Sequence, residues 1–385
     1  MKKGFVNGGI RAAIRFVASV ALFSGAALMP VLPVSCKSSD DDELKIEGET
    51  TGSASEDGRI TSPKVVACSA VSASAVQVSF SRKVSVEGIT FTDADGSVFS
   101  IAGDSVSFDD SGLCARIALP VSTDVGSSYK LSMTVFDADG NSQSYEQEFY
   151  GYNAMPARLI LSEVRTEYSK DKYCEFVELF ALRGGNICGL TLDTATIDGK
   201  DSLFPFVFPS VNVSAGDYIT VHMRNSGNVA GAVSEISDKT AAKAKDSSPT
   251  AWDLWVSTDD KLVGKNDIVL LEDGDSNILD GIIMSQSSKK EWSQKQRKIC
   301  EELFSIGIWK SGIEISDVIH TDNTAQNSTV SRQNIAELSG LYLGKDDIPD
   351  FIPTRTEDWI VTKSADKKNP GATPGLPNSS VKAGN

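Results

Sequence analysis

Apolar and polar residues alternate over much of the chain after Pro63. Short runs rich in valine, isoleucine, phenylalanine and tyrosine recur up to residue 150 at intervals of about 8–12 residues, with Gly, Asp and Ser between them. This rhythm is typical of an antiparallel β-sandwich. Beyond the strands expected within residues 65–80, the pattern predicts strands at Ile89–Phe91, Val98–Ile101, Val106–Phe108, Leu113–Leu119, Tyr129–Phe136 and Tyr145–Tyr150.

A second series of strand-like runs begins after Pro156. The run Glu175–Phe180 does not alternate strictly, because Phe176, Val177, Leu179 and Phe180 are all apolar. This pattern predicts either a strand covered on both faces or a β-bulge. The other strands expected in this series lie at Leu159–Val164, Ile187–Leu192, Phe206–Phe208, Tyr218–Val221 and Ile268–Leu271.

The stretch from Lys289 to Trp309 has a helical period instead. Trp292, Ile299, Leu303 and Ile306 can share one stripe of a helix, with charged residues between them. The stretch also holds the densest basic cluster of the chain, which could be a patch for a partner or for nucleic acid. A solvated helix face is the favoured interpretation in so acidic a chain. The cluster comprises Lys289, Lys290, Lys295, Arg297 and Lys298.

The N-terminal region has the pattern of an export signal. Four basic residues precede an apolar run from Phe16 to Leu32, and a small residue, Ser35, comes just before Cys36. The junction resembles a bacterial lipoprotein signal with Cys36 as the lipid acceptor, although Pro33 and Val34 depart from the usual pattern. An ordinary cleaved signal and an uncleaved anchor helix are the alternatives. The short, proline-containing run argues against the anchor helix.

The chain is acidic, with a formal net charge of −15, and loss of the four basic leader residues would change this charge to −19. Such a charge opposes binding to DNA or to an anionic membrane through bulk electrostatics. Membrane contact is therefore expected to come from acyl chains on Cys36. Residues 38–59 are polar and acidic, which predicts a flexible tether. The remaining length suits two domains better than one.

Five cysteines lie beyond Cys36, and none forms a Cys-x-x-Cys pair. A zinc ribbon or a thioredoxin-like motif is therefore unsupported. Cys68 with Cys114, and Cys174 with Cys188, are candidate disulfides between strands, which would leave Cys300 free. Buried free thiols, used as small apolar residues, are an equal alternative.

Two short motifs stand out in the first series of strands. Val76–Ser81 is followed by Val84, and Val135–Asn141 lies near the end of the series. Together they resemble the bacterial immunoglobulin-like modules of surface proteins, which implies such a sandwich over residues 60–152. The Asp-Ala-Asp-Gly sequences at Asp93 and Asp137 could suggest calcium. Neither continues as a calcium loop, and Asp-Gly is typical of hairpin turns.

Seven short motifs follow in order between Pro156 and Asn378, from Ser162-Glu163-Val164 to a closing Asn-Pro-Gly-Ala at 369–372. This ordered series resembles the lamin-tail domain, which implies a second immunoglobulin-like β-sandwich. Residues 225–262 and 284–328 are long for the loops of that family, and Thr-Pro-Gly follows the closing motif. On this alignment Leu254 and Val256 lie in an inserted loop. Truncating them should then change stability little.

Candidate catalytic chemistry is sparse. His222 and His320 are the only imidazoles, and neither lies in a metal-ligand spacing or near a nucleophile motif. Carboxylate pairs arise by chance in so acidic a chain. His222, on an expected strand, is interpreted as structural. We therefore expect no catalytic residue, no metal site and no cofactor.

These observations predict an all-β chain of two immunoglobulin-like β-sandwiches in tandem, the second with long insertions and one helix. We expect a lipid-anchored outer-membrane protein that faces the periplasm or the cell surface. Its expected role is non-enzymatic adhesion, architecture or binding of a protein or polysaccharide ligand, with nucleic acid not expected and the oligomeric state left open. An accessory binding protein of an extracellular polysaccharide- or nucleic-acid-degrading system is the alternative, and a hydrolytic site in the insertions is a third, weaker one.

The expected parts are a signal peptide (1–35), a tether (36–59), the first sandwich (60–152), the second sandwich (156–378, with insertions at 225–262 and 284–328) and a disordered tail (379–385).

Overall fold

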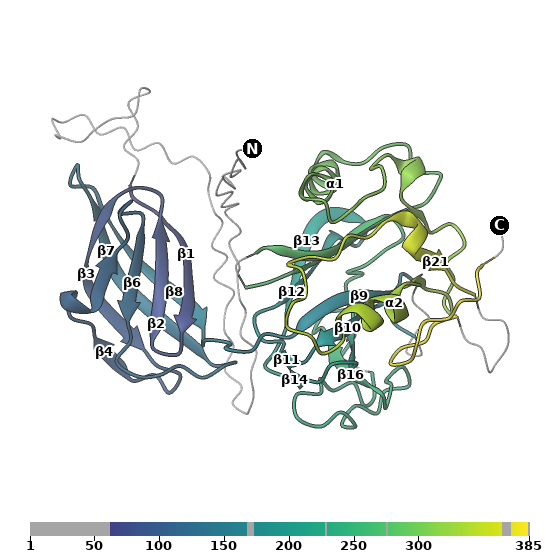
Figure 1. Cartoon of the computed structure of the whole chain (residues 1–385), viewed down its shortest axis with the longest axis horizontal. Helices are drawn as coiled ribbons and strands as arrows, with labels where there is room; N and C mark the ends of the chain where they lie inside the picture. Colours follow the sequence, from purple (N-terminus) through teal and green to yellow (C-terminus); the bar gives the residue numbers. More distant parts are fainter. Residues whose placement is uncertain (1–61, 168–172, 228, 275, 364–370, 384–385) are drawn as a thin grey trace. The chain divides into compact units, whose positions relative to one another are not determined.

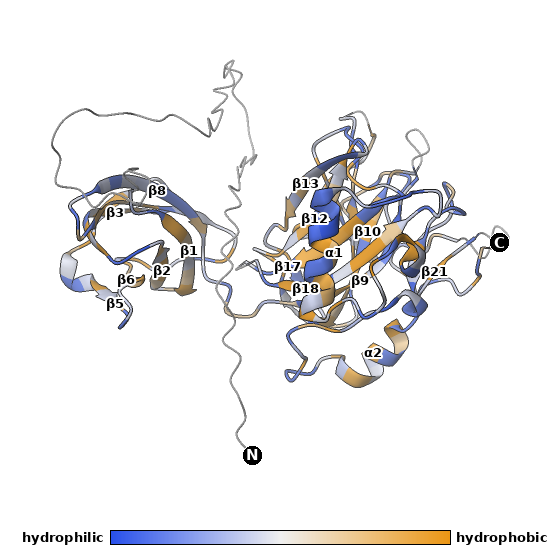
Figure 2. Cartoon of the chain, turned by 90° about the horizontal axis from the view of Figure 1, so that it is seen from above, coloured by the Kyte–Doolittle hydropathy of each residue, from blue (hydrophilic) through white to orange (hydrophobic). Residues whose placement is uncertain are grey.

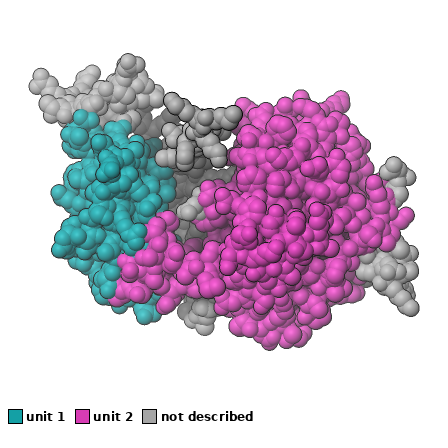
Figure 3. All heavy atoms as spheres, viewed as in Figure 1, with its two compact units in different colours: residues 1–68, 75–120, 130–149 teal, residues 69–74, 121–129, 150–385 magenta. Residues whose placement is uncertain are grey.

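The computed structural model divides the chain into two compact units (Figure 3). Within the described part, no helix is long and apolar enough to cross a membrane. The predicted leader, the tether and Cys36 lie outside the described residues. The structure describes residues 62–383 except 168–172, 228, 275 and 364–370. The first unit comprises the described residues up to 68 with 75–120 and 130–149, and the second comprises 69–74, 121–129 and the described residues from 150 onward.

The first unit is a sandwich of two four-stranded sheets (Figure 1). One sheet has the order β1-β2-β6-β5 and the other β4-β3-β7-β8. Every second residue of β7 is buried, which is the pattern of a strand with one face in the core. The strands are β1 (Val65–Ser72), β2 (Ala75–Phe80), β3 (Val84–Thr92), β4 (Val98–Ser100), β5 (Val106–Phe108), β6 (Cys114–Ala118), β7 (Ser128–Asp137) and β8 (Ser142–Tyr150).

The two Asp-Ala-Asp-Gly sequences form hairpin turns, between β3 and β4 and between β7 and β8. Asp93 Oδ1 accepts the backbone N–H groups of residues 95 and 97, at 3.0 and 2.8 Å. Asp137 Oδ1 accepts those of residues 139 and 141 in the same way. Gly96 and Gly140 adopt positive φ angles, which glycine allows without strain. In both sequences the carboxylate therefore serves to fold its own turn.

The second unit is a larger sandwich, and its main apolar core lies within it. Figure 2 shows apolar residues gathered along β9, β10, β17 and β18. The six-stranded sheet has the order β16-β15-β10-β9-β20-β21, the five-stranded sheet β13-β12-β17-β18-β19, and β11 pairs with β14. The strands are β9 (Arg158–Arg165), β10 (Phe176–Arg183), β11 (Gly185–Asn186), β12 (Thr191–Ile197), β13 (Lys200–Val207), β14 (Asn212–Val213), β15 (Tyr218–His222), β16 (Ala251–Trp255), β17 (Asp267–Glu272), β18 (Ile278–Ser285), β19 (Ile319–His320), β20 (Val330–Arg332) and β21 (Trp359–Val361).

Strand β10 has both features that its irregular sequence predicts. Its pairing register with β9 shifts between Glu178 and Leu179, which marks a bulge or irregularity. Its residues are also covered on both faces. Val177 and Leu179 belong to the main core, whereas Phe180 packs with Leu338 of helix α2 (Ile335–Tyr342).

The predicted helix is present as α1 (Gln294–Ile306), but its buried face differs from the expected stripe. Gln296, Cys300 and Leu303 are buried, whereas Ile306 is 41% exposed. The N-cap Ser293 accepts from the Gln296 N–H, and this cap sets where the helix begins. The sequence predicted one helix, and α2 is a second that its short length concealed.

The interpretation of residues 225–262 as an inserted loop is wrong. This stretch contains β16, which pairs parallel with β15, and two parallel neighbours require a long crossover between them. Leu254 and Val256 are 0% and 3% exposed and belong to the main core. Residues 284–328 likewise supply core side chains, since Cys300, Leu303 and Trp309 are fully buried. Both stretches are therefore parts of the sandwich, and the all-β prediction is confirmed.

Leu254→Ala should destabilise the second unit by about 2–5 kcal/mol, because it removes buried apolar contacts and leaves a cavity. All five tryptophans lie in this unit, so their fluorescence during urea unfolding of the full chain reports on it alone. Val233→Ala is the matched control, because Val233 lies in the same crossover but is 50% exposed. Equal effects of the two substitutions would contradict the placement of Leu254 in the core and would favour a surface loop.

Candidate functional site

A row of polar side chains crosses the six-stranded sheet of the second unit. The register places Glu163 of β9 opposite Glu178 of β10, and Glu178 opposite Thr220 of β15. Ser331 of β20 extends the row at one end and Asp253 of β16 at the other. All five residues are fully buried. Opposed residues share one face of a sheet, so the row faces away from the core side chains Ile219 and Val221.

Glu163 binds the C-terminal closing segment, residues 371–378. Thr373 donates its backbone N–H to Glu163 Oε2 at 3.1 Å and its hydroxyl to Oε1 at 3.3 Å. The hydroxyls of Thr329 and Ser331 also donate to Oε1. Burial raises the pKa of Glu163, while these donors lower it. The carboxylate thus joins β9 and β20 to the closing segment.

Glu178 holds the same segment one strand further along. Its Oε2 accepts the Gly375 backbone N–H at 2.5 Å, and its Oε1 lies 3.2 Å from the Ser162 hydroxyl. Burial raises the pKa of Glu178 well above its ordinary value, and the negative charge of Glu163 raises it further. Ionising both of two neighbouring buried carboxylates is unfavourable, because their negative charges repel each other. We therefore assign the negative charge to Glu163, which has more donors, and a proton to Glu178.

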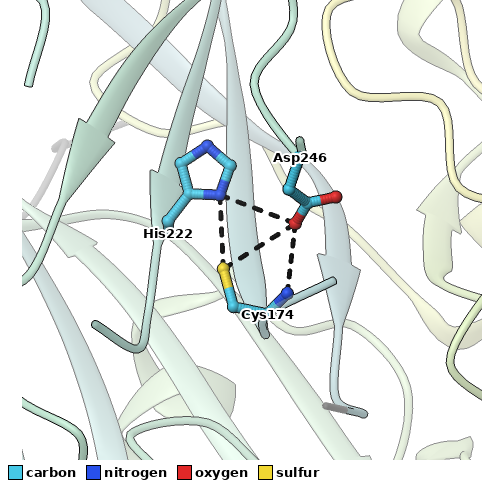
Figure 4. A group of neighbouring side chains, drawn as sticks. All are labelled: Cys174, His222 and Asp246. Atoms are coloured by element: carbon cyan, nitrogen blue, oxygen red, sulfur yellow. Dashed lines mark hydrogen bonds and ion pairs between the residues drawn. The ribbon is translucent and has the colours of Figure 1, made fainter. Parts of the chain in front are cut away.

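The row continues into a cluster around His222 (Figure 4). His222 Nε2 lies 2.7 Å from Asp253 Oδ1, and its ring stacks on Trp255 with a centroid distance of 3.9 Å. On the other side of the ring, Nδ1 lies 3.4 Å from Cys174 Sγ and 3.7 Å from Asp246 Oδ2. Burial lowers the pKa of His222, but Cys174 and Asp253 outweigh it and raise the pKa to about 10.

Asp246 closes the cluster from the crossover between β15 and β16. Its Oδ2 lies 3.7 Å from Cys174 Sγ and accepts the Cys174 backbone N–H at 3.2 Å. The guanidinium of Arg165 also donates to Oδ2, and its Nε donates to the Cys174 carbonyl at 2.7 Å. Cys174, His222 and Asp246 are all buried, and together they could hold a metal ion.

The same groups also resemble a thiol nucleophile, an imidazole base and an orienting carboxylate. Such a nucleophile needs an open approach for substrate, whereas Cys174 is 7% exposed and His222 is 0% exposed. Asp253, at Nε2, holds the position of an orienting carboxylate, whereas Asp246 lies on the thiol side of the ring, beside the sulfur itself (Figure 4). The buried thiol and imidazole therefore disfavour nucleophilic catalysis, and Cys174, His222 and Asp246 place three ligand atoms around one point.

The candidate disulfides are corrected by the structure, in which Cys68, Cys114, Cys174, Cys188 and Cys300 are free thiols. Cys68 lies on β1 and Cys114 on β6, and β2 separates these strands. Two strand spacings amount to about 9–10 Å, which exceeds the reach of a disulfide. The Cys174 sulfur instead faces His222 and Asp246. The free-thiol alternative is the one that fits.

The remaining sequence candidates lie elsewhere in the second unit. His320 is exposed, its Nε2 lies 2.9 Å from the Ile315 carbonyl, and it lines a broad hollow with Asp322 and Arg355. In the basic cluster on α1, Arg297 pairs with Glu301 and with a second glutamate, Glu314, each at 3.0 Å. These pairs agree with a solvated helix face.

Sequence reasoning missed the cluster because its members are far apart in the chain. Cys174 precedes His222 by 48 residues and Asp246 by 72, which no metal-ligand spacing would select. One signal was available. Thr220 and His222 alternate with the apolar Ile219 and Val221 along the sequence, and a polar strand face inside a sandwich needs buried partners.

A family model matches the second unit. The model of the TP_1001 protein second domain matches residues 157–361. A protein of Treponema pallidum (strain Nichols), described as an uncharacterized protein, is 28% identical over 169 residues. The match covers 43% of this chain, and the chain spans 42% of the length of that relative.

Solved structures give weaker likenesses. The N-terminal part of the bacterial S-layer protein SbsC has a TM-score of 0.23 and 19% identity, over 42% of this chain and 40% of that one. Dimeric latent PorU from Porphyromonas gingivalis has a TM-score of 0.17 and 14% identity. That match covers 46% of this chain and 18% of the PorU chain. Scores this low support no inference about this chain.

Glu178→Gln should change the stability of the second unit by about 1 kcal/mol or less, because the amide can accept from Gly375 and donate to Ser162. Glu178→Ala removes both partners and should cost about 1–3 kcal/mol through the orphaned Gly375 N–H. Urea unfolding of both variants, followed by tryptophan fluorescence, measures the difference. A Gln variant as unstable as the Ala variant would show that Glu178 must be ionised.

The proton on Glu178 also gives stability a pH dependence of defined sign. The folded state holds this proton more tightly than the unfolded chain does. Its contribution is therefore fully present below the ordinary pKa of 4.5 and is lost as the pH rises toward the folded value. The free energy of unfolding of the wild type should fall relative to Glu178→Gln as the pH rises from 4.5. A constant difference over that range would contradict the assignment.

Proposed function

This chain belongs to the family of the TP_1001 protein second domain, and we propose that it is a lipid-anchored cell-envelope protein whose β-sandwiches form a non-enzymatic structural or binding module. The leader supports the anchor, since Cys36 follows a basic and then apolar stretch and precedes an acidic run at 40–43. Each buried CH₂ of an acyl chain contributes about 0.8 kcal/mol, so several chains would hold the protein firmly at a bilayer.

The observation that carries the structural role is what the buried carboxylates bind. Glu163 and Glu178 are both fully buried, and hydroxyl and N–H groups of this same chain fill their acceptor positions. A general acid or base must instead reach the proton of a bound substrate. The pair is therefore suited to fastening the closing segment to the sheet.

The same contacts support our proposal that the second unit is a lamin-tail-like sandwich. Its opening motifs supply Glu163 and Glu178, and the Thr-Pro-Gly sequence directly after its closing motif supplies Thr373 and Gly375. A direct bond between the two ends of the domain is a physical reason for these motifs to occur together.

We further propose that the module acts at the outer membrane, on the periplasmic or the outer face, with a protein or polysaccharide as its partner. The acidic charge of the chain supports this choice, because it opposes association with nucleic acid. An accessory role beside an extracellular degrading enzyme is compatible with the same module.

Cys36→Ala should abolish incorporation of labelled palmitate and move the protein from the membrane to the soluble fraction. Cys68→Ala is the matched control, because Cys68 lies within β1 and should leave labelling unchanged. The readout is metabolic palmitate labelling with fractionation of the same cells. Equal label in wild type and Cys36→Ala would reject the anchor.

A further inference from the structure

Three ligand atoms in the second unit are spaced as if around a metal ion. Cys174 Sγ and His222 Nδ1 are 3.4 Å apart, and Asp246 Oδ2 lies 3.7 Å from each of them. Tetrahedral zinc has bonds of about 2.3 Å to sulfur and 2.0–2.2 Å to nitrogen and oxygen, which separates its ligand atoms by about 3.3–3.7 Å. The three atoms therefore already stand at coordination spacing.

The surroundings fix these side chains as the outer shell of a metal site does. A metal-bound histidine usually donates its second ring N–H to a carboxylate. His222 Nε2 lies 2.7 Å from Asp253 Oδ1, which leaves Nδ1 facing Cys174 and Asp246. Asp253 is held in turn by the Ser248 N–H at 2.8 Å, and Trp255 stacks on the imidazole. The ring therefore has little freedom to turn away.

The pocket can also balance the charge of a divalent ion. With an ion bound, Asp246, Asp253 and a thiolate at Cys174 would supply three negative charges, and Arg165 would supply one positive charge. A divalent ion balances the difference when His222 is neutral, and ligands lose their protons when the ion binds. Arg165 holds Asp246 by donating to its Oδ2. It thereby acts as an outer-shell partner of the carboxylate.

We propose that Cys174, His222 and Asp246 bind one zinc-class divalent ion. Thiolate and imidazole ligands select zinc and its neighbours in the first transition row over calcium and magnesium, which prefer oxygen. The ion ties the entry of β10, the end of β15 and the crossover before β16 at one point. This inference is independent of the lipid anchor.

The test is metal binding by the full chain after removal of bound metal with a chelator. Co²⁺ should bind with a stoichiometry near one per chain and give a thiolate-to-cobalt charge-transfer band, and Zn²⁺ should displace it. Zn²⁺ should also raise the unfolding midpoint followed by tryptophan fluorescence, because it binds only the folded cluster. Wild-type protein without the band or the shift would overturn the proposal.

Variants separate this cluster from adventitious binding. Cys174→Ser should abolish the charge-transfer band, whereas Cys188→Ser, another buried thiol of the same unit, should retain it. Asp253→Asn should keep the band and weaken Zn²⁺ binding by about 10–100-fold, as for other outer-shell carboxylates. If Cys174→Ser does not fold, the wild-type spectrum and the Asp253→Asn affinity still decide. A band that persists in folded Cys174→Ser, or an unchanged affinity in Asp253→Asn, would refute the site.

Discussion

The second unit depends on keeping a row of polar side chains away from water. Glu163 and Glu178 lie side by side on adjacent strands, and both are fully buried. An uncompensated buried carboxylate is strongly unfavourable, so the sheet needs donors above this row. Thr373 and Gly375 of the closing segment supply them. The sandwich is therefore complete only when the end of the domain lies across β9 and β10, which come from its beginning.

The other end of the row imposes a similar requirement on the crossover. Asp253 aligns with Thr220 in the parallel pair of β15 and β16, and it accepts the Ser248 N–H. Gly375 meets the crossover at this point, where a Cβ would lie 2.4 Å from Ser248 Oγ. Glycine is thus needed for the closing segment to approach so closely. The crossover and the closing segment therefore stabilise each other's conformation.

Much of the sandwich could be read from periodicity, because strands with one buried face alternate visibly. The two-sided strand β10 was identified from its irregular pattern, and the Asp-Gly turns from their local chemistry. The crossover was not, because polar residues on both sides of β16 concealed a strand whose parallel partner is distant in sequence. Local patterns could not place Cys174 beside His222 either, since only the pairing of β10 with β15 brings them together. Burial of Leu254 likewise depends on that long-range arrangement.

Hydrogen exchange at the closing segment tests the central claim most directly. If buried carboxylates fasten this segment, the amides of Thr373 and Gly375 should exchange only when the whole second unit unfolds, at the rate of amides in β10. Amides at residues 379–380, beyond the carboxylate contacts, should exchange faster. Exchange at Thr373 and Gly375 as fast as at 379–380 would contradict the account, because the polar row would then be stable without its cover.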